Sequence, residues 1–125
     1  MAGLLHKLLA LPHTSSQSDI DDPNTTLIHR DIILSKPFLK KIYLFWYQEI
    51  IKPYKPTDKI LEIGSGGGFL KEVFPTVITS DIMPLPNCDM VVDATDIPYE
   101  NNSLDGIVMV NVFHHIPDSE KFLTE

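Results

Sequence analysis

The sequence predicts an α/β protein: a parallel, Rossmann-like sheet with helices on both faces, preceded by further helices. Four short apolar runs rich in β-branched residues predict the strands, near residues 59–63, 76–80, 89–93 and 106–113. Their hydrophobicity is uninterrupted rather than alternating, which is typical of strands buried on both faces. A glycine cluster at 64–68 follows the first run directly, as in folds that bind a ligand at the carboxyl end of a parallel strand.

Length, composition and charge narrow the class of protein. With 125 residues, 43% of them hydrophobic, the chain can bury the core of one compact domain. Its 17 acidic against 10 basic side chains give a net charge of -7. This balance argues against a nucleic-acid partner, because domains that bind phosphate backbones carry a basic face. The single cysteine, Cys88, excludes an internal disulfide. No apolar stretch approaches the roughly 20 residues that cross a bilayer, so we expect a cytoplasmic protein with no membrane partner.

The first part of the chain, residues 1–57, is predicted to be a helical segment with a linker. Leucines recur at helical spacing in residues 3–11, so a short helix is expected there. After a polar stretch, Thr25 or Thr26 can cap a second helix, and Ser35 can cap a longer third one. The aromatic residues of this third helix are interpreted as core rather than as a stacking platform for nucleic acid.

Residues 58–125 are predicted to form the sheet-containing domain. Between the first two strands only residues 68–75 are available, whereas a parallel crossover usually takes a dozen or more residues. We still predict a parallel crossover, because Phe69, Leu70 and Val73 would give that short helix one apolar face. After the fourth run, acidic residues mark the start of a further helix.

The strongest functional signal is the segment 62–68, Glu-Ile-Gly-Ser-Gly-Gly-Gly. Its glycines remove Cβ atoms where a tight turn brings backbone amides close to a ligand. The N-terminus of the following helix favours an anionic group. A dinucleotide fingerprint would need its third glycine at position 69, where Phe69 stands. The spacing therefore favours a different nucleotide ligand over NAD.

This segment, 62–68, resembles the first motif of class I S-adenosylmethionine-dependent methyltransferases. Three later segments, 80–82, 92–99 and 111–118, fall where that family places its further motifs. The resemblance covers residues 58–125 and is nearest to the small-molecule branch of the family. It implies S-adenosylmethionine as cofactor and a small-molecule substrate. It also implies four strands in the order 3-2-1-4 out of the family's seven, so we interpret the chain as the N-terminal portion of a methyltransferase.

The resemblance implies cofactor-binding roles for individual residues. Asp81, at the end of the second strand, would accept hydrogen bonds from the two ribose hydroxyls, and Asp93 would accept one from the adenine amino group. Glu62 has two open interpretations: it holds the cofactor's ammonium group through water, or it fixes the glycine loop. The full expected set is Glu62, Gly64, Ser65, Gly66, Gly68, Asp81, Ile82, Asp93, Ala94 and Asn111.

His114 and Tyr43 are expected on the substrate side, and no catalytic residue is assigned. No metal site is expected, because two adjacent histidines on a strand point to opposite sides. The open edge of the fourth strand can pair with another copy, so self-association is a further expectation. Two other functions stay open: a nucleotide- or S-adenosylmethionine-binding module without catalysis, and a fragment of an NAD-dependent oxidoreductase.

Overall fold

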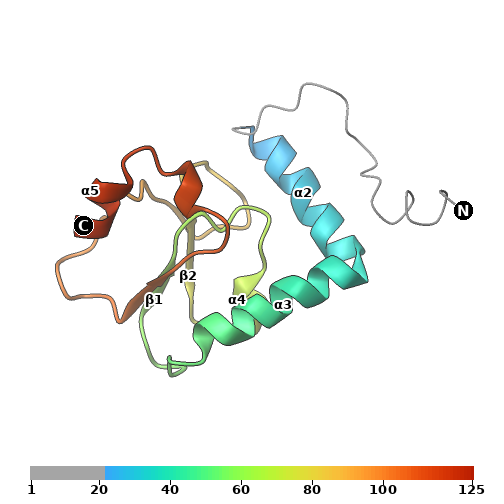
Figure 1. The fold of residues 1–125 in the computed structure, drawn as a ribbon, viewed down its shortest axis with the longest axis horizontal. Helices are drawn as coiled ribbons and strands as arrows, with labels where there is room; N and C mark the ends of the chain where they lie inside the picture. The colour runs from blue at the N-terminus through green and yellow to red at the C-terminus, as the bar shows by residue number, and fades with distance from the viewer. Residues whose placement is uncertain (1–21) are drawn as a thin grey trace, which may run out of the picture.

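The computed structural model describes residues 22–125 (Figure 1). The helix expected at residues 3–11 lies outside the described residues. Two helices come first, α2 (Pro23–Ser35) and α3 (Pro37–Ile51). The remaining elements are β1 (Ile60–Glu62), α4 (Leu70–Val73), β2 (Ile78–Asp81), β3 (Met90–Val91), β4 (Gly106–Val108), the 3-10 helix η1 (Phe113–His115) and α5 (Ser119–Thr124).

The four strands form one parallel sheet in the order β3-β2-β1-β4, which confirms the predicted fold class and strand order. In the central strand, Leu61 lies between Ile78 of β2 and Ile107 of β4. Because all strands are parallel, their carboxyl ends meet at one edge of the sheet. The loops that follow β1, β2, β3 and β4 therefore gather at that edge.

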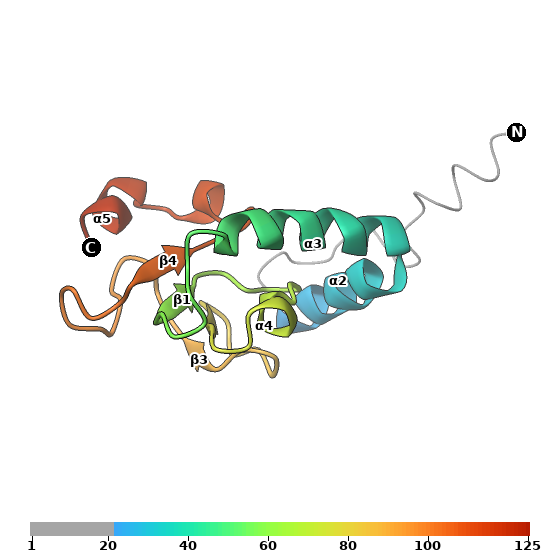
Figure 2. The same cartoon turned by 90° about the horizontal axis from the view of Figure 1, so that it is seen from below.

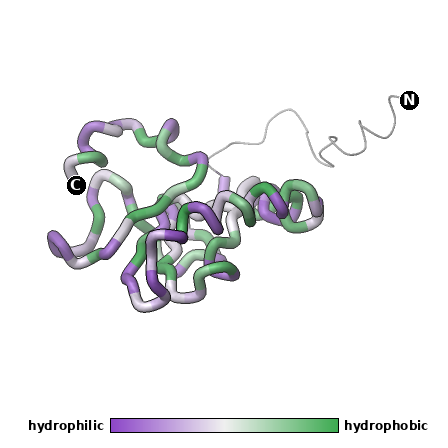
Figure 3. Tube along the Cα trace, turned by 60° about the horizontal axis from the view of Figure 1, so that its bottom comes forward, coloured by the Kyte–Doolittle hydropathy of each residue, from purple (hydrophilic) through white to green (hydrophobic). Residues whose placement is uncertain are grey.

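Each face of the sheet has its own hydrophobic core, because successive side chains of a strand point to opposite faces. Ile60 packs with Tyr47 of α3 and with Phe69 and Leu70 at the start of α4. Leu61, one residue later, packs in the second core with Val92. Figure 2 shows the resulting arrangement, with α2, α3 and α4 grouped at one side and α5 at the other. In Figure 3, hydrophobic stretches of the chain are separated by hydrophilic turns.

The boundaries of α2 and α3 differ from the prediction. The N-cap of α2 is Asp22, whose side chain accepts a hydrogen bond from the Asn24 amide at 2.9 Å, and neither Thr25 nor Thr26 caps it. Ser35 is the last residue of α2, and the N-cap of α3 is Lys36 in an extended conformation. The physical reason is the proline that follows Lys36, because a residue before proline is pushed out of the helical region.

The short crossover between β1 and β2 is confirmed, with α4 occupying only four residues. The fourth strand, by contrast, was expected over 106–113 and ends at Val108. Its neighbour β1 ends at Glu62, which is paired with Val108, so the chain beyond has no strand to pair with. It turns at Asn111, whose φ is +58°, and enters η1. Among residues 22–125, no helix is long and apolar enough to span a membrane.

Candidate functional site

A cavity of about 410 Å³ lies at the carboxyl ends of the strands. Residues of the loops after all four strands line it, together with residues of α2 and α3, which we call the helical wall. Eleven of the twelve residues expected at the site line it: Tyr43, Glu62, Gly64, Ser65, Gly66, Gly68, Asp81, Ile82, Asp93, Ala94 and Asn111. Their roles in binding stay predictions, but the structure brings these eleven residues together.

The glycine loop after β1 is a tight turn fixed by backbone hydrogen bonds. Gly64 and Gly66 both have positive φ, +65° and +47°. The Ser65 amide donates to the Ser80 carbonyl at 2.8 Å, and the Gly68 amide donates back to the Ser65 carbonyl at 2.7 Å. A Cβ on Gly64 would lie 2.5 Å from a methyl group of Val112. Glycine at this position therefore allows both the turn and the close approach of the chain after β4.

Glu62 is the buried acid beneath this loop. Its side chain is 2% exposed, and the Ser65 hydroxyl donates to its Oε2 at 2.6 Å. Burial raises the pKa of Glu62 to about 7, and the hydrogen bond from Ser65 opposes that rise. The loop-fixing contact is thus present in the structure, and the carboxyl group lines the cavity as well. Since one oxygen accepts several hydrogen bonds, the two interpretations of Glu62 are compatible.

Asp81 ties the end of β2 to the glycine loop. Its Oδ2 accepts from the Gly66 amide at 2.9 Å, and its Oδ1 accepts from the Met83 amide at 3.0 Å. The residue is 5% exposed and lines the cavity. A carboxylate has about four acceptor positions, so these two amides leave capacity for hydroxyl groups of a ligand.

The end of β3 presents Asp93 in a different setting. This side chain is exposed, and its Oδ1 accepts from both the amide and the hydroxyl of Thr95 at 2.8 Å. The hydrogen bond from the Thr95 amide lowers the pKa of Asp93. The Thr95 amide therefore already donates its hydrogen bond within the turn. Ala94 between them is buried, whereas Ile82 on the opposite loop is 63% exposed, an apolar side chain at the cavity rim.

The chain after β4 corrects one predicted site residue. His115, and not His114, lines the cavity. The prediction assumed that both lie on a strand and point to opposite sides. In the 3-10 helix η1 adjacent side chains are instead about 120° apart, and the two imidazole rings lie 3.9 Å apart between centroids. Among residues 22–125, no group of three or more His, Cys, Asp or Glu side chains is arranged to hold a metal ion.

The helical wall contains residues that the sequence analysis did not assign. Thr26, His29 and Ile33 of α2 line the cavity together with Tyr43 and Tyr47 of α3. The three α2 residues are spaced by three and four positions and so share one helix face. The sequence alone shows this spacing and so predicts that the three residues share a face. It does not predict that this face lines the cavity.

Tyr47 and Arg30 hold this wall against the glycine loop. The Tyr47 hydroxyl accepts from the Phe69 amide at 3.1 Å, and burial raises the Tyr47 pKa far above its ordinary value. The Arg30 guanidinium donates to the Gly68 carbonyl. A Cβ on Gly68 would lie 2.3 Å from the Tyr47 hydroxyl, and one on Gly67 would lie 2.9 Å from the Arg30 backbone. The glycine pair therefore lets both helices approach the loop.

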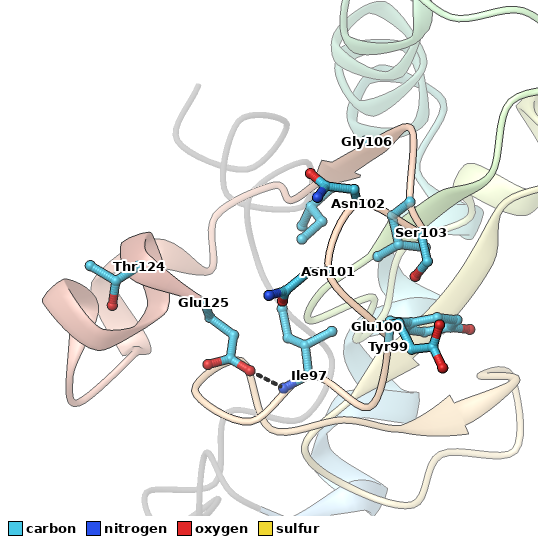
Figure 4. A pocket seen from close by; sticks show the side chains of 11 residues that line it. Ile97, Tyr99, Glu100, Asn101, Asn102, Ser103, Gly106, Thr124 and Glu125 are labelled. Atoms are coloured by element: carbon cyan, nitrogen blue, oxygen red, sulfur yellow. Dashed lines mark hydrogen bonds between the residues drawn. The ribbon is translucent and has the colours of Figure 1, made fainter.

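A second cavity of about 420 Å³ lies elsewhere, beside the start of β4 (Figure 4). It is lined by the loop 99–104 and by Thr124 and Glu125, and the Ile97 amide donates to a carboxylate oxygen of Glu125 at 3.1 Å. None of the predicted site residues lines it. The glycine-loop cavity is therefore the candidate site.

Comparison with known proteins supplies one match. The family model described as "Methyltransferase domain" matches residues 61–125. The matched region begins within β1 and includes the glycine loop, Asp81 and Asp93. No curated protein and no solved structure matches the chain.

Proposed function

Because the chain belongs to the methyltransferase domain family, we propose that its glycine-loop cavity binds S-adenosylmethionine and that the protein methylates a small molecule. The observation that carries this proposal is the meeting of the glycine loop with two acids, Glu62 and Asp81, in one cavity. The acids come from neighbouring strands, and both contact the loop through hydrogen bonds.

The volume of the cavity and the open space at Gly66 support a small-molecule ligand such as a nucleoside. Its volume of about 410 Å³ is within the range of about 300–1,000 Å³ typical of small-molecule sites. A Cβ on Gly66 would meet no atom closer than 3.8 Å, and its nearest neighbours would be Asp81, Gly64 and Thr26. Glycine here leaves open the space between the loop, β2 and α2, where a ligand can approach the backbone.

Each acid has a distinct task in this proposal. When bound, the cofactor supplies a methyl group on a positively charged sulfur. Glu62 would hold the ammonium group of the cofactor's amino-acid end, next to the loop amides. Asp81 would accept hydrogen bonds from the ribose hydroxyls, and Asp93 would accept one from the adenine amino group. Ile82 would pack its exposed apolar side chain against the base.

The helical wall would receive the methyl acceptor. Tyr43, Tyr47 and Ile33 present aromatic and apolar surface to the cavity, which excludes water from the reacting groups. His29 and His115 are the imidazole side chains in its lining. The chain's task in methyl transfer is to hold the acceptor in line with the methyl group, and no base is assigned. The acidic net charge favours a small molecule over nucleic acid as acceptor.

Titration calorimetry with adenosylhomocysteine and with NAD tests the proposed ligand. We expect adenosylhomocysteine to bind and NAD not to bind, because Phe69 replaces the third glycine of the dinucleotide fingerprint and is buried in the core. Binding of NAD alone would overturn the proposal in favour of an oxidoreductase fragment. A methyl-transfer assay with the same protein then separates an enzyme from a binding module without catalysis.

A further inference from the structure

We propose that α3 docks the protein on an anionic membrane surface through its outer face. The outer face consists of Phe38, Ile42, Phe45 and Trp46, which recur at spacings of four, three and one residues on one side of the helix and do not belong to the core under α3. Glu49, paired with Lys52, lies on the same side, and the Trp46 ring packs at its border against Tyr43. Phe38 is 45% exposed, Phe45 59% and Trp46 37%, so the interpretation of the aromatic residues of α3 as core is wrong for these three. Single exposed apolar residues are common, but a group of large ones on one helix marks a binding surface.

The core-facing side of the same helix is already occupied. Tyr43, Tyr47, Ile50 and Ile51 pack on the core formed with β1 and α4. Helix α3 is therefore apolar on both sides, and packing within the described residues explains only one of them. The outer face therefore needs a binding partner whose chemistry matches its exposed side chains.

The distribution of basic and acidic side chains along the chain indicates what that partner is. Six of the chain's ten basic side chains lie between residues 36 and 59, with only two of its 17 acidic ones. The rest of the chain holds four basic and fifteen acidic side chains. Five of the six, Lys36, Lys40, Lys41, Lys52 and Lys55, lie in α3 or within four residues of its ends, and Lys52 is paired with Glu49. The sixth, Lys59, stands before β1 with its ammonium over the Tyr99 ring. An anionic surface would attract this part of the protein and repel the remainder, which fixes one orientation.

Aromatic side chains beside lysines are the composition of helices that lie in the membrane interface. Trp and Phe enter the boundary between headgroups and acyl chains, and lysines contact anionic lipids. The sequence predicts no membrane partner because no stretch is long enough to span a bilayer, but a helix lying on the surface needs no such stretch. This inference is independent of the methyl-transfer proposal.

Other occupants fit the charge less well. Residues 3–11 carry Lys7 and no acid, so their charge does not complement the lysines in and near α3. A second copy docked by the same face would bring the lysines of both copies together. A nucleic acid would meet the same net charge of -7 as an anionic membrane, but it has no acyl layer to cover the aliphatic side chain of Ile42.

Trp46 is the chain's only tryptophan, so its fluorescence reports on the outer face directly. The test uses the full 125-residue chain and vesicles of phosphatidylcholine, with or without one third phosphatidylglycerol. We expect the emission to shift to the blue, and quenching by acrylamide to fall, only with the phosphatidylglycerol vesicles. Added salt should weaken both effects. No shift with these vesicles would overturn the proposal.

Two pairs of substitutions locate the contact. Phe45→Ser and Lys41→Glu should each weaken partition to vesicles by about tenfold. The matched controls Phe113→Ser, at a side chain 46% exposed outside α3, and Lys121→Glu on α5 should change it less than about twofold. Because all four side chains are exposed, the variants should melt like wild type. If one of the α3 variants does not fold, the other carries the comparison.

Three outcomes favour other occupants and would overturn the proposal. Trp46 shielded from acrylamide in the free monomer would mean that another segment of the chain covers the face. A blue shift that grows with protein concentration without vesicles would indicate a second copy. Binding to a single-stranded oligonucleotide without binding to vesicles would indicate nucleic acid.

Discussion

The two sides of the cavity are built differently, although both lie at the carboxyl ends of parallel strands. On the β1–β2 side, buried polar groups join residues far apart in the sequence: Gly66 to Asp81, and the Ser80 hydroxyl to the Glu62 carbonyl at 2.6 Å. On the β3–β4 side, Asp93 is exposed and its carboxylate accepts hydrogen bonds from Thr95, only two residues onward.

The difference predicts where substitutions have large effects. A buried polar group that loses its partner keeps the full desolvation penalty, whereas an exposed one regains water. Changes on the β1–β2 side should therefore affect folding and binding together. Changes on the β3–β4 side should affect binding alone, and by less. The substitutions below test this contrast, in order of decreasing effect.

Gly66→Val should have the largest effect on binding. Valine disfavours the positive φ of +47° at this position, and its side chain would enter the space between Asp81 and Thr26. We expect adenosylhomocysteine affinity to fall by at least about a hundredfold in calorimetry, with a near-native circular dichroism spectrum at room temperature and a lower melting temperature. Asn102→Val is the matched control, because Asn102 also has a positive φ, +61°, and lines the other cavity. Equal binding by the glycine variant would show that the loop is not the site.

Asp81→Ala should weaken adenosylhomocysteine by about tenfold to a thousandfold, because the two charge-assisted hydrogen bonds that we propose to the ribose would be lost. Asp81→Asn should fall between wild type and alanine. The alanine variant should also melt at a lower temperature, since the amides of Gly66 and Met83 lose their acceptor.

A ligand without the 2′-hydroxyl separates the two roles of Asp81. If the side chain binds the ribose, Asp81→Ala should weaken the 2′-deoxy ligand less than it weakens adenosylhomocysteine. If it only fixes the loop, both ligands should weaken equally. Unchanged affinity for both would contradict either role.

Glu62→Gln should change how stability depends on pH. The folded-state pKa of Glu62 is about 7, against an ordinary 4.5, so the folded state holds the proton between these values and the unfolded state releases it. The contribution to stability is therefore complete below about pH 4.5 and is lost as the pH rises to 7, by at most about 3 kcal/mol. Glutamine imitates the protonated acid, so urea unfolding of the variant should lack this decrease.

Glu100→Gln, at an exposed acid of the other cavity, is the matched control and should keep the wild-type pH dependence. The same slope in Glu62→Gln as in wild type would mean that burial does not raise the pKa of Glu62 in the folded protein.

The same contrast explains which parts of the site the sequence could predict. Glu62, the glycines and Asp81 follow from local signals: an apolar run, a turn that only glycine tolerates, and an acid at the end of the next run. The end of β4 does not follow from a local signal, because the hydrophobic run in the sequence continues to residue 113. The strand stops at Val108 because β1 stops at Glu62, which is a fact about another segment. The α2 wall likewise depends on the packing of Gly67 against Arg30.

Asp93→Ala should have the smallest effect, a three- to tenfold loss of adenosylhomocysteine affinity. The carboxylate is exposed, so water competes for any hydrogen bond that it makes to the adenine amino group. Oδ1 already accepts from the amide and hydroxyl of Thr95, which leaves Oδ2 as the oxygen that would accept from the adenine amino group. Thr95→Val is the control for the turn, since it removes one of these hydrogen bonds and keeps the carboxylate.

S-inosylhomocysteine, in which an oxygen replaces the adenine amino group, sharpens this last test. Wild type should bind it more weakly than adenosylhomocysteine, because the carboxylate would face an acceptor instead of a donor. Asp93→Ala should bind the two ligands with nearly equal affinity, and Thr95→Val should keep the wild-type preference. If Asp93→Ala keeps that preference, Asp93 does not recognise adenine. Its carboxylate would then shape only the turn after β3, and the β1–β2 side would supply the acidic contacts to the ligand.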